Sequence, residues 1–321
     1  VVAPYNIDSI AQSEGWDNLL DPMIAAIHKC ENNSGPYCAA PVNIHRIDWM
    51  WANKAVFDAN GISVPTTWDE LNAAAEKLKA AGIIPFAHGG QAWQDATVFE
   101  AVAMGLGGNN YYKNCYVDLK ESCLRSETTV KVFDQMRKLQ SYTDEGSPGR
   151  DWNVATGMVI EGKAGFQIMG DWAKGEFTAA GKVPGVDYYC AATPSNNGYL
   201  YNVDSFIFYK SSDPDKQAGQ QLLAKLMMGK NFQKVFNLYK GSIPARLDVS
   251  MDEFDKCAKT SNADIKTAGA KGGLVPSFAH GMAQGNTMKA ALQDIITEHF
   301  NSDMSSVDAA NALADSVLAN M

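Results

Sequence analysis

Several features that would mark a large class of protein are missing from this sequence. No apolar run approaches the roughly 20 residues that a membrane-spanning helix needs. Lysine and arginine total 27 against 36 aspartate and glutamate, so the formal net charge is −9. No basic stretch with interleaved aromatic residues offsets the negative field, which would repel a phosphate backbone. The sequence therefore predicts neither a membrane span nor a nucleic-acid partner.

Motifs for catalysis and cofactor binding are also missing. Residues 157–164 (GMVIEGKA) come close to a phosphate-binding loop, but Ala164 stands where a Ser or Thr hydroxyl would hold magnesium. This segment also joins a helix to a strand, the reverse of the required order. No GxSxG or HExxH motif occurs, and no cysteine forms a CxxC pair or lies at zinc spacing from a histidine. The sequence therefore predicts no metal site and no nucleotide cofactor, and the familiar catalytic signatures are absent.

What the chain does have is the composition of an ordinary globular protein. It has 321 residues, of which 46% are hydrophobic and 20% are charged. At about 150 residues per domain, this length predicts roughly two domains, with enough chain to bury a substantial core. No repeat, low-complexity tract or proline-rich linker separates the domains, so we expect ordinary strands to cross between them.

Amphipathic helices alternate with short apolar strands along the chain. Residues 66–82 predict a helix, because Thr67 and Glu70 can form a capping box and Gly82 can end it. The same reasoning predicts helices over 128–143, 213–228, 287–300 and 305–321. Strands are expected over 83–90, 162–169, 186–193 and 199–210. This alternation is typical of an α/β fold with covered sheets.

The six cysteines favour three disulfides and hence an oxidising compartment. Turn-forming residues lie between the first two cysteines and bring their thiols within reach of a bridge. The next two have the same spacing, which leaves the last two to pair by elimination. The alternative is six reduced, buried thiols. The predicted pairs are Cys30–Cys38, Cys115–Cys123 and Cys190–Cys257.

Aromatic, acidic, amide and basic side chains recur at predicted strand ends and in turns. Sugar recognition uses this mixture, because the C–H faces of a sugar ring stack on aromatic side chains while each hydroxyl needs a donor and an acceptor. The residues so placed are Trp93, Gln94, Asp171, Trp172, Asn202, Asp204, Lys240 and His280.

Each of these residues, taken singly, is more readily explained by a structural role. For other residues of the same types we prefer the structural interpretation outright: core positions for Trp16, Trp49, Trp51, Trp68 and Trp152, and solvated helix faces for His28 and His299. A rival function also stays open, that of a glycoside hydrolase. Its acid and base would come from Asp171, Glu176 or Asp204, and the distance between the carboxylates would decide the matter.

Five segments, in order along the chain, carry the motifs of one known family. They are residues 39–90, 157–177, 201–210, 237–246 and 273–283, and the first contains the pattern Pro-x-Thr-Trp-Asp-Glu-Leu. These segments resemble the periplasmic solute-binding proteins of bacterial ABC sugar importers, in the maltose-binding-protein-like class. The turns AHGGQAWQD and GDWAKGEF are similar to those of its proteobacterial glucose-binding branch.

The resemblance implies an α/β periplasmic-binding-protein fold of type II, in which two lobes close on a ligand by hinge motion. Hinge crossings are expected near 43–46, 202–204 and 244–247. Lobe one would hold residues 1–44 and 204–245, and lobe two would hold 46–203 and 246–321. The first βα units of the family have no counterpart before Val1, so we expect lobe one to be incomplete at its N-terminus.

The resemblance also implies roles for individual residues. Trp172 is expected to stack on the sugar ring. Hydroxyl contacts are expected from Asn202, Asp204, Lys240 and His280, with His45 as a weaker candidate. Further contacts are expected from Gln91, from Trp93 or Gln94, and from Asp171.

The implied protein is periplasmic and non-enzymatic, and it binds a monosaccharide, with glucose as the first candidate. It would deliver this sugar to an inner-membrane ABC permease through ligand-biased closure. We expect a monomer, unless another chain supplies the missing N-terminal part. A chemoreceptor-coupled sensor would share the fold and stays an alternative.

Overall fold

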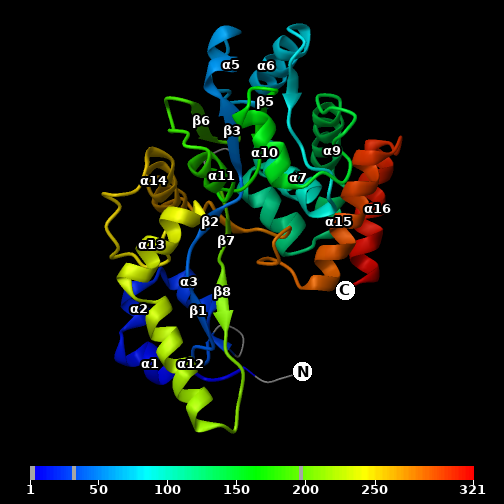
Figure 1. Ribbon diagram of the computed structural model, residues 1–321. Coiled ribbons are helices and arrows are strands. Elements are labelled where there is room, and N and C mark those ends of the chain that lie inside the picture. The colour runs from blue at the N-terminus through cyan, green and yellow to red at the C-terminus, as the bar shows by residue number, and fades with distance from the viewer. Residues whose placement is uncertain (1–3, 31–33, 195–197) are drawn as a thin grey trace. The chain divides into compact units, whose positions relative to one another are not determined.

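The computed structural model describes residues 4–30, 34–194 and 198–321 (Figure 1). Contacts divide the chain into two compact units. Unit 1 consists of Val1–His45 and Val203–Phe254, and unit 2 consists of Arg46–Asn202 and Asp255–Met321. Each unit is therefore built from two separate stretches of sequence.

Unit 1 combines short helices, a two-stranded sheet and two longer helices. Its elements are α1 (Asp8–Ser13), α2 (Trp16–Leu19), α3 (Pro22–Ile27), β1 (Ala39–Pro41), β8 (Ser205–Ile207), α12 (Pro214–Met227) and α13 (Lys230–Lys240). Strands β1 and β8 pair antiparallel. Helix α12 begins where expected, because the Asp213 carboxylate caps its first turn and Pro214 occupies the first helical position.

A four-stranded mixed sheet forms the centre of unit 2. Its order is β4 (Ile84–Phe86), β5 (Ala164–Ile168), β3 (Trp49–Asn53) and β6 (Tyr188–Ala192). Strands β4 and β5 run parallel, and the other two pairs are antiparallel. A second sheet has the order β2 (His45–Arg46), β7 (Tyr199–Asn202) and β9 (Leu274–Pro276). All positions of β5 are buried, as in a strand that is covered on both faces.

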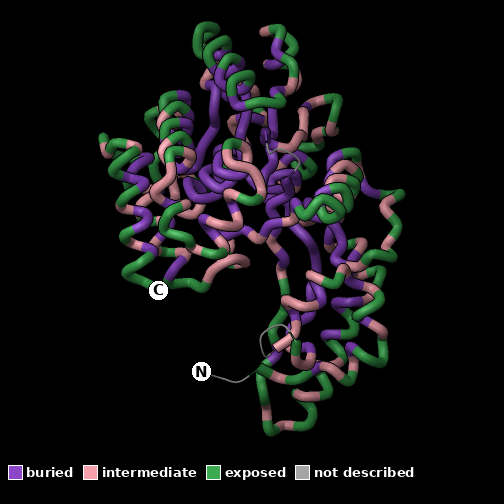
Figure 2. The backbone as a smooth tube through the Cα atoms, turned by 180° about the vertical axis from the view of Figure 1, so that it is seen from behind, coloured by how far each residue is buried: buried purple, intermediate pink, exposed green. Residues whose placement is uncertain are grey.

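Helices surround these sheets and contribute most of the buried core (Figure 2). They are α5 (Lys54–Ala59), α6 (Trp68–Ala80), α7 (Ala92–Tyr112), α8 (Glu121–Leu124), α9 (Glu127–Gln140), α10 (Trp152–Ile160), α11 (Ala173–Ala179), α14 (Lys256–Ala270), α15 (Asn286–Asn301) and α16 (Ser306–Ala319), with a π-helical turn at Lys113–Val117. Helix α7 packs against α9 and α15 and is buried all round from Gln94 to Met104, which is typical of a central helix.

The predicted helices form close to their expected ends. Thr67 and Glu70 make both bonds of the capping box at the start of α6, and α9, α15 and α16 cover the other predicted segments. Trp16, Trp49, Trp51 and Trp68 are buried as expected, whereas Trp152 is only partly buried.

The apolar segment 199–210 forms two strands instead of the single strand expected. Strand β7 ends at Asn202 in unit 2, and β8 begins at Ser205 in unit 1. Between them the Asp204 backbone N–H donates to Asn43 Oδ1 at 2.8 Å, and the Val42 N–H donates to the Asp204 carbonyl at 2.9 Å. At Asp204, where the chain passes from unit 2 to unit 1, the backbone therefore bonds to Val42 and Asn43.

The segment 244–247, expected to be a crossing, lies inside unit 1, which extends to Phe254. The Leu247 N–H donates to the Leu19 carbonyl at 2.8 Å, and Arg246 forms a bridge with Leu20. These bonds hold the segment to the first helices of unit 1. Hinge motion of the units as lobes stays a prediction.

All three predicted disulfides are present. The Cα–Cα distances are 5.9 Å for Cys30–Cys38, 5.1 Å for Cys115–Cys123 and 5.9 Å for Cys190–Cys257. The last of these fastens α14 to strand β6 across 67 residues of sequence. A link across so long a loop restricts the unfolded chain strongly.

The prediction of solvated positions for His28 and His299 is wrong. His28 is 3% exposed and His299 is 0% exposed. The His28 ring bonds to the Ile24 carbonyl at 2.6 Å and to the Ser205 hydroxyl at 2.5 Å. The His299 ring lies 4.7 Å, centre to centre, from Phe133. Burial lowers the pKa of each imidazole to about 4.

Replacing His299 with phenylalanine is expected to make the fold less sensitive to acid. Neither ring nitrogen of His299 has a hydrogen-bond partner among the described residues, so a ring of similar shape loses no bond. The unfolded chain takes up a proton at His299 below the ordinary pKa of 6.5, whereas the folded chain does so only near 4. Each such group therefore removes up to about 1.4 kcal/mol of stability per pH unit as the pH falls through this window.

Urea unfolding of wild type and His299→Phe at pH 7, 5.5 and 4.5 measures this difference. The decline of the unfolding free energy with falling pH should be shallower in the variant. His28→Phe is the matched control: its decline should also be shallower, but its stability at pH 7 should drop because two hydrogen bonds are lost. Equal slopes for wild type and His299→Phe would contradict the prediction.

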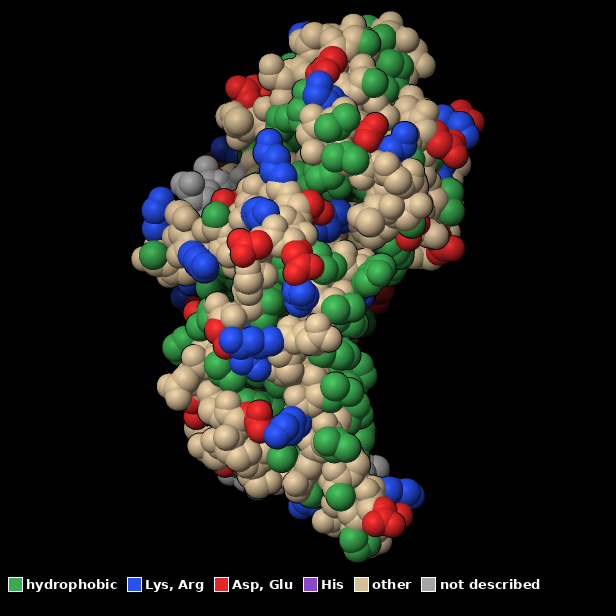
Figure 3. Space-filling view, turned by 60° about the vertical axis from the view of Figure 1, so that its left-hand side comes forward, with side chains coloured by type: hydrophobic (Ala, Val, Ile, Leu, Met, Phe, Trp, Pro, Cys, Tyr) green, Lys and Arg blue, Asp and Glu red, His purple; other side chains and the backbone are tan. Residues whose placement is uncertain are grey.

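Unit 1 also exposes hydrophobic side chains (Figure 3). A groove between α12 and α13 is lined by Leu222, Lys225, Leu226, Gly229, Asn231, Phe232, Val235 and Phe236. Leu222 is 69% exposed and Leu226 is 58% exposed. None of the residues predicted to bind ligand lines this groove.

Candidate ligand-binding site

Three predicted residues of unit 2 form an aromatic cluster. The ring centres are 6.3 Å apart for Trp93 and Trp172, 5.1 Å for Trp172 and His280, and 6.0 Å for Trp93 and His280. The rings are tilted or edge-to-face, the arrangement that aromatic quadrupoles favour. They come from the start of α7, the turn between β5 and α11, and the turn after β9. All three are only partly buried, so the cluster presents aromatic surface.

Close packing and one hydroxyl hold these rings in place. A Cβ on Gly170 would lie 2.2 Å from the Trp172 ring, so the indole packs directly on the glycine backbone. The Thr97 hydroxyl donates to the Trp93 carbonyl at 2.8 Å and lies 3.0 Å from His280 Nε2. Because a hydroxyl has one proton to donate, His280 Nε2 is the donor in the second bond.

Gln91 and Gln94 form hydrogen bonds beside the cluster. The Gln91 side-chain carbonyl accepts the Trp93 indole N–H at 2.8 Å and the Gln94 amide at 3.0 Å. The Gln91 amide in turn donates to Asp151 at 2.6 Å. Gln94 is fully buried and also donates to the Arg150 carbonyl at 3.0 Å. Of Trp93 and Gln94, the first is partly exposed and the second is not.

Asp171 ties the Trp172 turn to the start of unit 2. Its carboxylate accepts the Arg46 backbone N–H at 2.9 Å, and its own N–H donates to the Arg46 carbonyl at 2.9 Å. Asp171 is buried, so the two bonds fix the turn against β2. Asn202 is the last residue of β7 and is partly exposed.

A second set of predicted residues lies in unit 1 around Asp204. Its carboxylate oxygen Oδ2 accepts from Asn43 Nδ2 at 3.0 Å and from His45 Nε2 at 3.0 Å, and Lys240 Nζ lies 3.5 Å from it. Partial burial raises the pKa of Asp204, but the bonds from His45 and Asn43 and the Lys240 charge outweigh burial and hold it well below its usual range. Asp204 is therefore ionised at neutral pH and offers an acceptor beside the Lys240 donor.

Arg46 forms a buried network that sequence analysis did not single out. Its Nε and Nη2 donate to the two Asp48 oxygens at 3.3 and 3.1 Å, and its Nη1 donates to Asp264 at 2.6 Å. The guanidinium lies 4.7 Å from the Trp49 ring and 4.8 Å from the Tyr199 ring. The signal available in the sequence was Arg-x-Asp, since alternate residues of an extended chain lie on one face.

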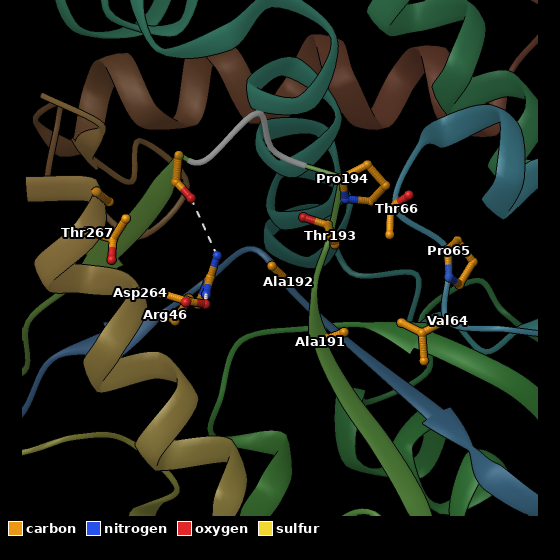
Figure 4. Close-up of a pocket in the computed structure, with 12 residues that line it drawn as sticks. Arg46, Val64, Pro65, Thr66, Ala191, Ala192, Thr193, Pro194, Asp264 and Thr267 are labelled. Carbon is orange, nitrogen blue, oxygen red and sulfur yellow. Dashed lines mark hydrogen bonds and ion pairs between the residues drawn. The ribbon is translucent and has the colours of Figure 1, made fainter. Parts of the chain in front are cut away.

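A cavity of about 400 Å³ lies beside this network in unit 2 (Figure 4). Figure 4 shows Arg46 beside Asp264 and Thr267, with Thr193, Pro194 and Thr66 on the opposite side. None of the residues predicted to bind ligand lines the cavity. It is therefore formed by a different set of side chains from the aromatic cluster.

Two further kinds of site were sought in the part of the chain that the structure describes, a metal-binding cluster and a membrane-spanning helix. No three His, Cys, Asp or Glu side chains there are placed to hold a metal ion. None of the helices in the described ranges is both long and apolar enough to cross a membrane.

Comparison with known proteins identifies the family. Residues 1–227 match the family model of the bacterial extracellular solute-binding protein. The chain is 46% identical over 313 residues to a "Probable sugar-binding periplasmic protein" of Brucella suis, which covers 97% of this chain and 73% of that protein. A protein of the same description from Rhizobium meliloti is 45% identical over 313 residues, covering 97% and 74%.

Among solved structures, the bacterial solute receptor AcbH matches with a TM-score of 0.84 at 18% identity, covering 99% of this chain and 80% of that one. AcbH is described as having an exclusive preference for β-D-galactopyranose. At this identity the likeness shows the fold alone, and it confirms the predicted α/β periplasmic-binding-protein class.

These relationships settle three predictions. Proteins of this family bind solutes and do not transform them, so the chain is not an enzyme and the glycoside-hydrolase interpretation of Asp171, Glu176 and Asp204 is set aside. The periplasmic location is confirmed by the relatives. The chain belongs to the bacterial extracellular solute-binding protein family.

Proposed function

We propose that the chain is the binding component of an ABC sugar importer and that its ligand is a monosaccharide, with glucose as the first candidate. Family membership makes it a solute-binding protein, and the Brucella and Rhizobium relatives are described as sugar-binding. The observation that carries the proposal is the partly exposed cluster of Trp93, Trp172 and His280. The three rings of this cluster lie within 6.3 Å of one another, centre to centre. This small extent supports a ligand with one sugar ring, because the rings of an oligosaccharide would stack on aromatic side chains spread over a greater length.

Polar groups of unit 1 supply the second half of the proposed recognition. The ionised Asp204 carboxylate and the Lys240 ammonium group lie together, and charge-assisted hydrogen bonds of this kind are about twice as strong as neutral ones. Adjacent sugar hydroxyls can each donate to one such group and accept from the other. We therefore assign ring stacking to Trp172 and hydroxyl binding to Asn202, Asp204, Lys240 and His280.

The proposed mechanism is population shift. Units 1 and 2 act as the two lobes, and both contribute contacts to one sugar, so binding favours the closed form. The closed, sugar-loaded protein is the state that an inner-membrane ABC permease accepts. Calorimetry with glucose, galactose, mannose, xylose and maltose tests the ligand class. We expect heat from one or more monosaccharides and none from maltose; no heat from any sugar would refute the proposal.

Replacing Trp172 with alanine is expected to weaken sugar binding by about 2 kcal/mol, roughly thirtyfold, because a central aromatic contact is lost. Calorimetry measures the change in Kd. Trp172→Phe should keep most of the affinity, since a flat ring remains. Gly170→Ala should fall between them, because its added methyl displaces the indole. Full affinity in Trp172→Ala would rule out the stacking role.

A further inference from the structure

The buried carboxyl of Glu100 is a hub of hydrogen bonds near the aromatic cluster. Glu100 lies in the middle of α7 and has no exposed surface. Its Oε1 accepts the Ser277 hydroxyl at 2.6 Å. Its Oε2 accepts the Tyr112 hydroxyl at 2.9 Å and the backbone N–H groups of Phe278 and Ala279 at 3.1 and 3.4 Å. All four neighbours donate, and a carboxylate is the side-chain group that only accepts.

These bonds lead directly to His280. The Ser277 hydroxyl that donates to Glu100 also accepts the backbone N–H of His280 at 3.1 Å. Earlier on the same helix, the Thr97 hydroxyl holds the His280 ring at 3.0 Å. Trp93, Thr97 and Glu100 are spaced i, i+4 and i+7 and so share one face of α7. This face supplies the Trp93 ring. It also fixes His280 in two ways, through the Thr97 hydroxyl at its ring and through Glu100 and Ser277 at its backbone N–H.

We propose that Glu100 is a positioning residue for ligand binding: by holding the turn 277–279, it sets His280 against Trp93 and Trp172. Glu100 acts through this turn and does not contact the sugar. The inference rests on the proposed function only where it concerns sugar affinity. The placement of His280 by Glu100 can be measured without any ligand.

Protonation of Glu100 would change the same hydrogen bonds and so gives a second way to test its role. Burial raises the pKa of Glu100 to about 7, although the four donors oppose this rise. The titratable groups around it are Tyr112 at the end of α7, beyond the kink at Gly108, His280 on the turn, and Asp48, whose charge acts on Tyr112. The Tyr112 hydroxyl also lies 3.2 Å from the Pro276 carbonyl. When Glu100 takes up a proton, Tyr112 can donate to Pro276 instead and accept from Glu100, which leaves a weaker, neutral acceptor for the turn.

The first experiment uses the full chain without sugar. Nitrogen-15 chemical shifts of the His280 imidazole, assigned with His280→Gln, report its protonation and hydrogen bonding. In Glu100→Gln these shifts should move, because the new amide faces donors. Asn72→Ala, which breaks the buried Asn72–Gln135 pair in the same unit, is the control and should leave them in place. Unchanged His280 shifts in Glu100→Gln would overturn the proposal.

The second experiment measures affinity for the sugar that wild type binds. Glu100→Gln should bind about tenfold more weakly, and Glu100→Gln/His280→Ala should bind no more weakly than His280→Ala alone. Wild-type affinity should rise between pH 6 and 8, and this rise should be smaller in Glu100→Gln. Additive losses or parallel pH profiles would overturn the proposal.

Two other outcomes, no sugar binding by wild type and a Glu100→Gln variant that does not fold, can be told apart from a failure of this inference. If wild type binds no sugar, the proposed function fails, while the His280 shifts still decide the role of Glu100. If Glu100→Gln does not fold, Ser277→Ala removes only the hydroxyl link and should move the same His280 shifts. Unmoved shifts in that variant would also overturn the proposal.

Discussion

Replacing Arg46 with methionine is expected to lower the free energy of unfolding by about 4 kcal/mol, because removing one partner leaves a buried charge uncompensated. Arg46 and Asp48 are both buried, and the guanidinium also holds Asp264 and the Gly198 carbonyl. Methionine fills similar volume without a charge. The loss would therefore measure the electrostatics of the network more than its packing.

The dependence of this loss on pH separates charge from packing. Burial raises the pKa of Asp48, and the Arg46 charge opposes that rise. Without Arg46 the folded-state pKa of Asp48 rises further above its value in the unfolded chain. A carboxyl shifted in this direction destabilises the fold increasingly as pH rises from the unfolded value through the folded one. Arg46→Met should therefore cost more at pH 7 than at pH 5.

Two variants serve as controls in urea unfolding. Arg46→Met/Asp48→Asn should recover much of the loss, because the new amide is neutral and its oxygen can still accept the Leu200 N–H. Arg46→Lys keeps the charge but loses the paired bonds to Asp48 and should fall between wild type and Arg46→Met. A loss below about 1 kcal/mol in Arg46→Met, or one independent of pH, would show that the pair contributes little.

Replacing Asp204 with asparagine is expected to weaken monosaccharide binding by about 3 kcal/mol, at least a hundredfold. The shape is kept, but the ionised acceptor is replaced by a neutral amide whose nitrogen meets the donors of Asn43, His45 and Lys240. In the proposed site, the sugar hydroxyls would lose a charge-assisted bond, and Lys240 would lose its counter-charge. Calorimetry with the sugar that wild type binds measures the effect.

Two lysines of α13 give matched comparisons for Asp204. Lys240→Met should weaken binding by about tenfold, since a bond to a charged group is typically worth 1.5 kcal/mol or more. Lys234, on the same helix, pairs with Glu253 at 2.7 Å in an exposed position, so Lys234→Met should bind like wild type. Binding by Asp204→Asn within threefold of wild type would remove Asp204 from the site.

Local chemistry explains which parts of the fold could be predicted from the sequence. The capping residues of α6 are three positions apart, and the first two disulfides each close eight residues. Such features depend on residues that are close together in the sequence, so their spacing alone predicts them. The two strands β7 and β8 were not separable in this way, because the bonds that divide them come from Val42 and Asn43, about 160 residues earlier.

The same argument applies to the candidate site. Trp93, Trp172 and His280 were named from residue type and resemblance, but their meeting depends on three segments that are far apart in the sequence. Glu100 was missed because its partner Ser277 is 177 residues away. Arg46 has Asp48 two residues on, but Asp264, which completes its network, is 218 residues away. His28 and His299 were misjudged because a histidine on a helix gives no sign of which face is covered.

The shared face of α7 constrains any attempt to change ligand preference. Trp93, Thr97 and Glu100 stand on successive turns of one buried helix, so inserting or deleting a residue between them would turn one part of this face about 100° away from the rest. Asp204 and Lys240, by contrast, come from separate segments of unit 1. To design a variant for a new sugar, we would therefore change Asp204 and Lys240 one at a time. We would leave Trp93, Thr97 and Glu100 unchanged.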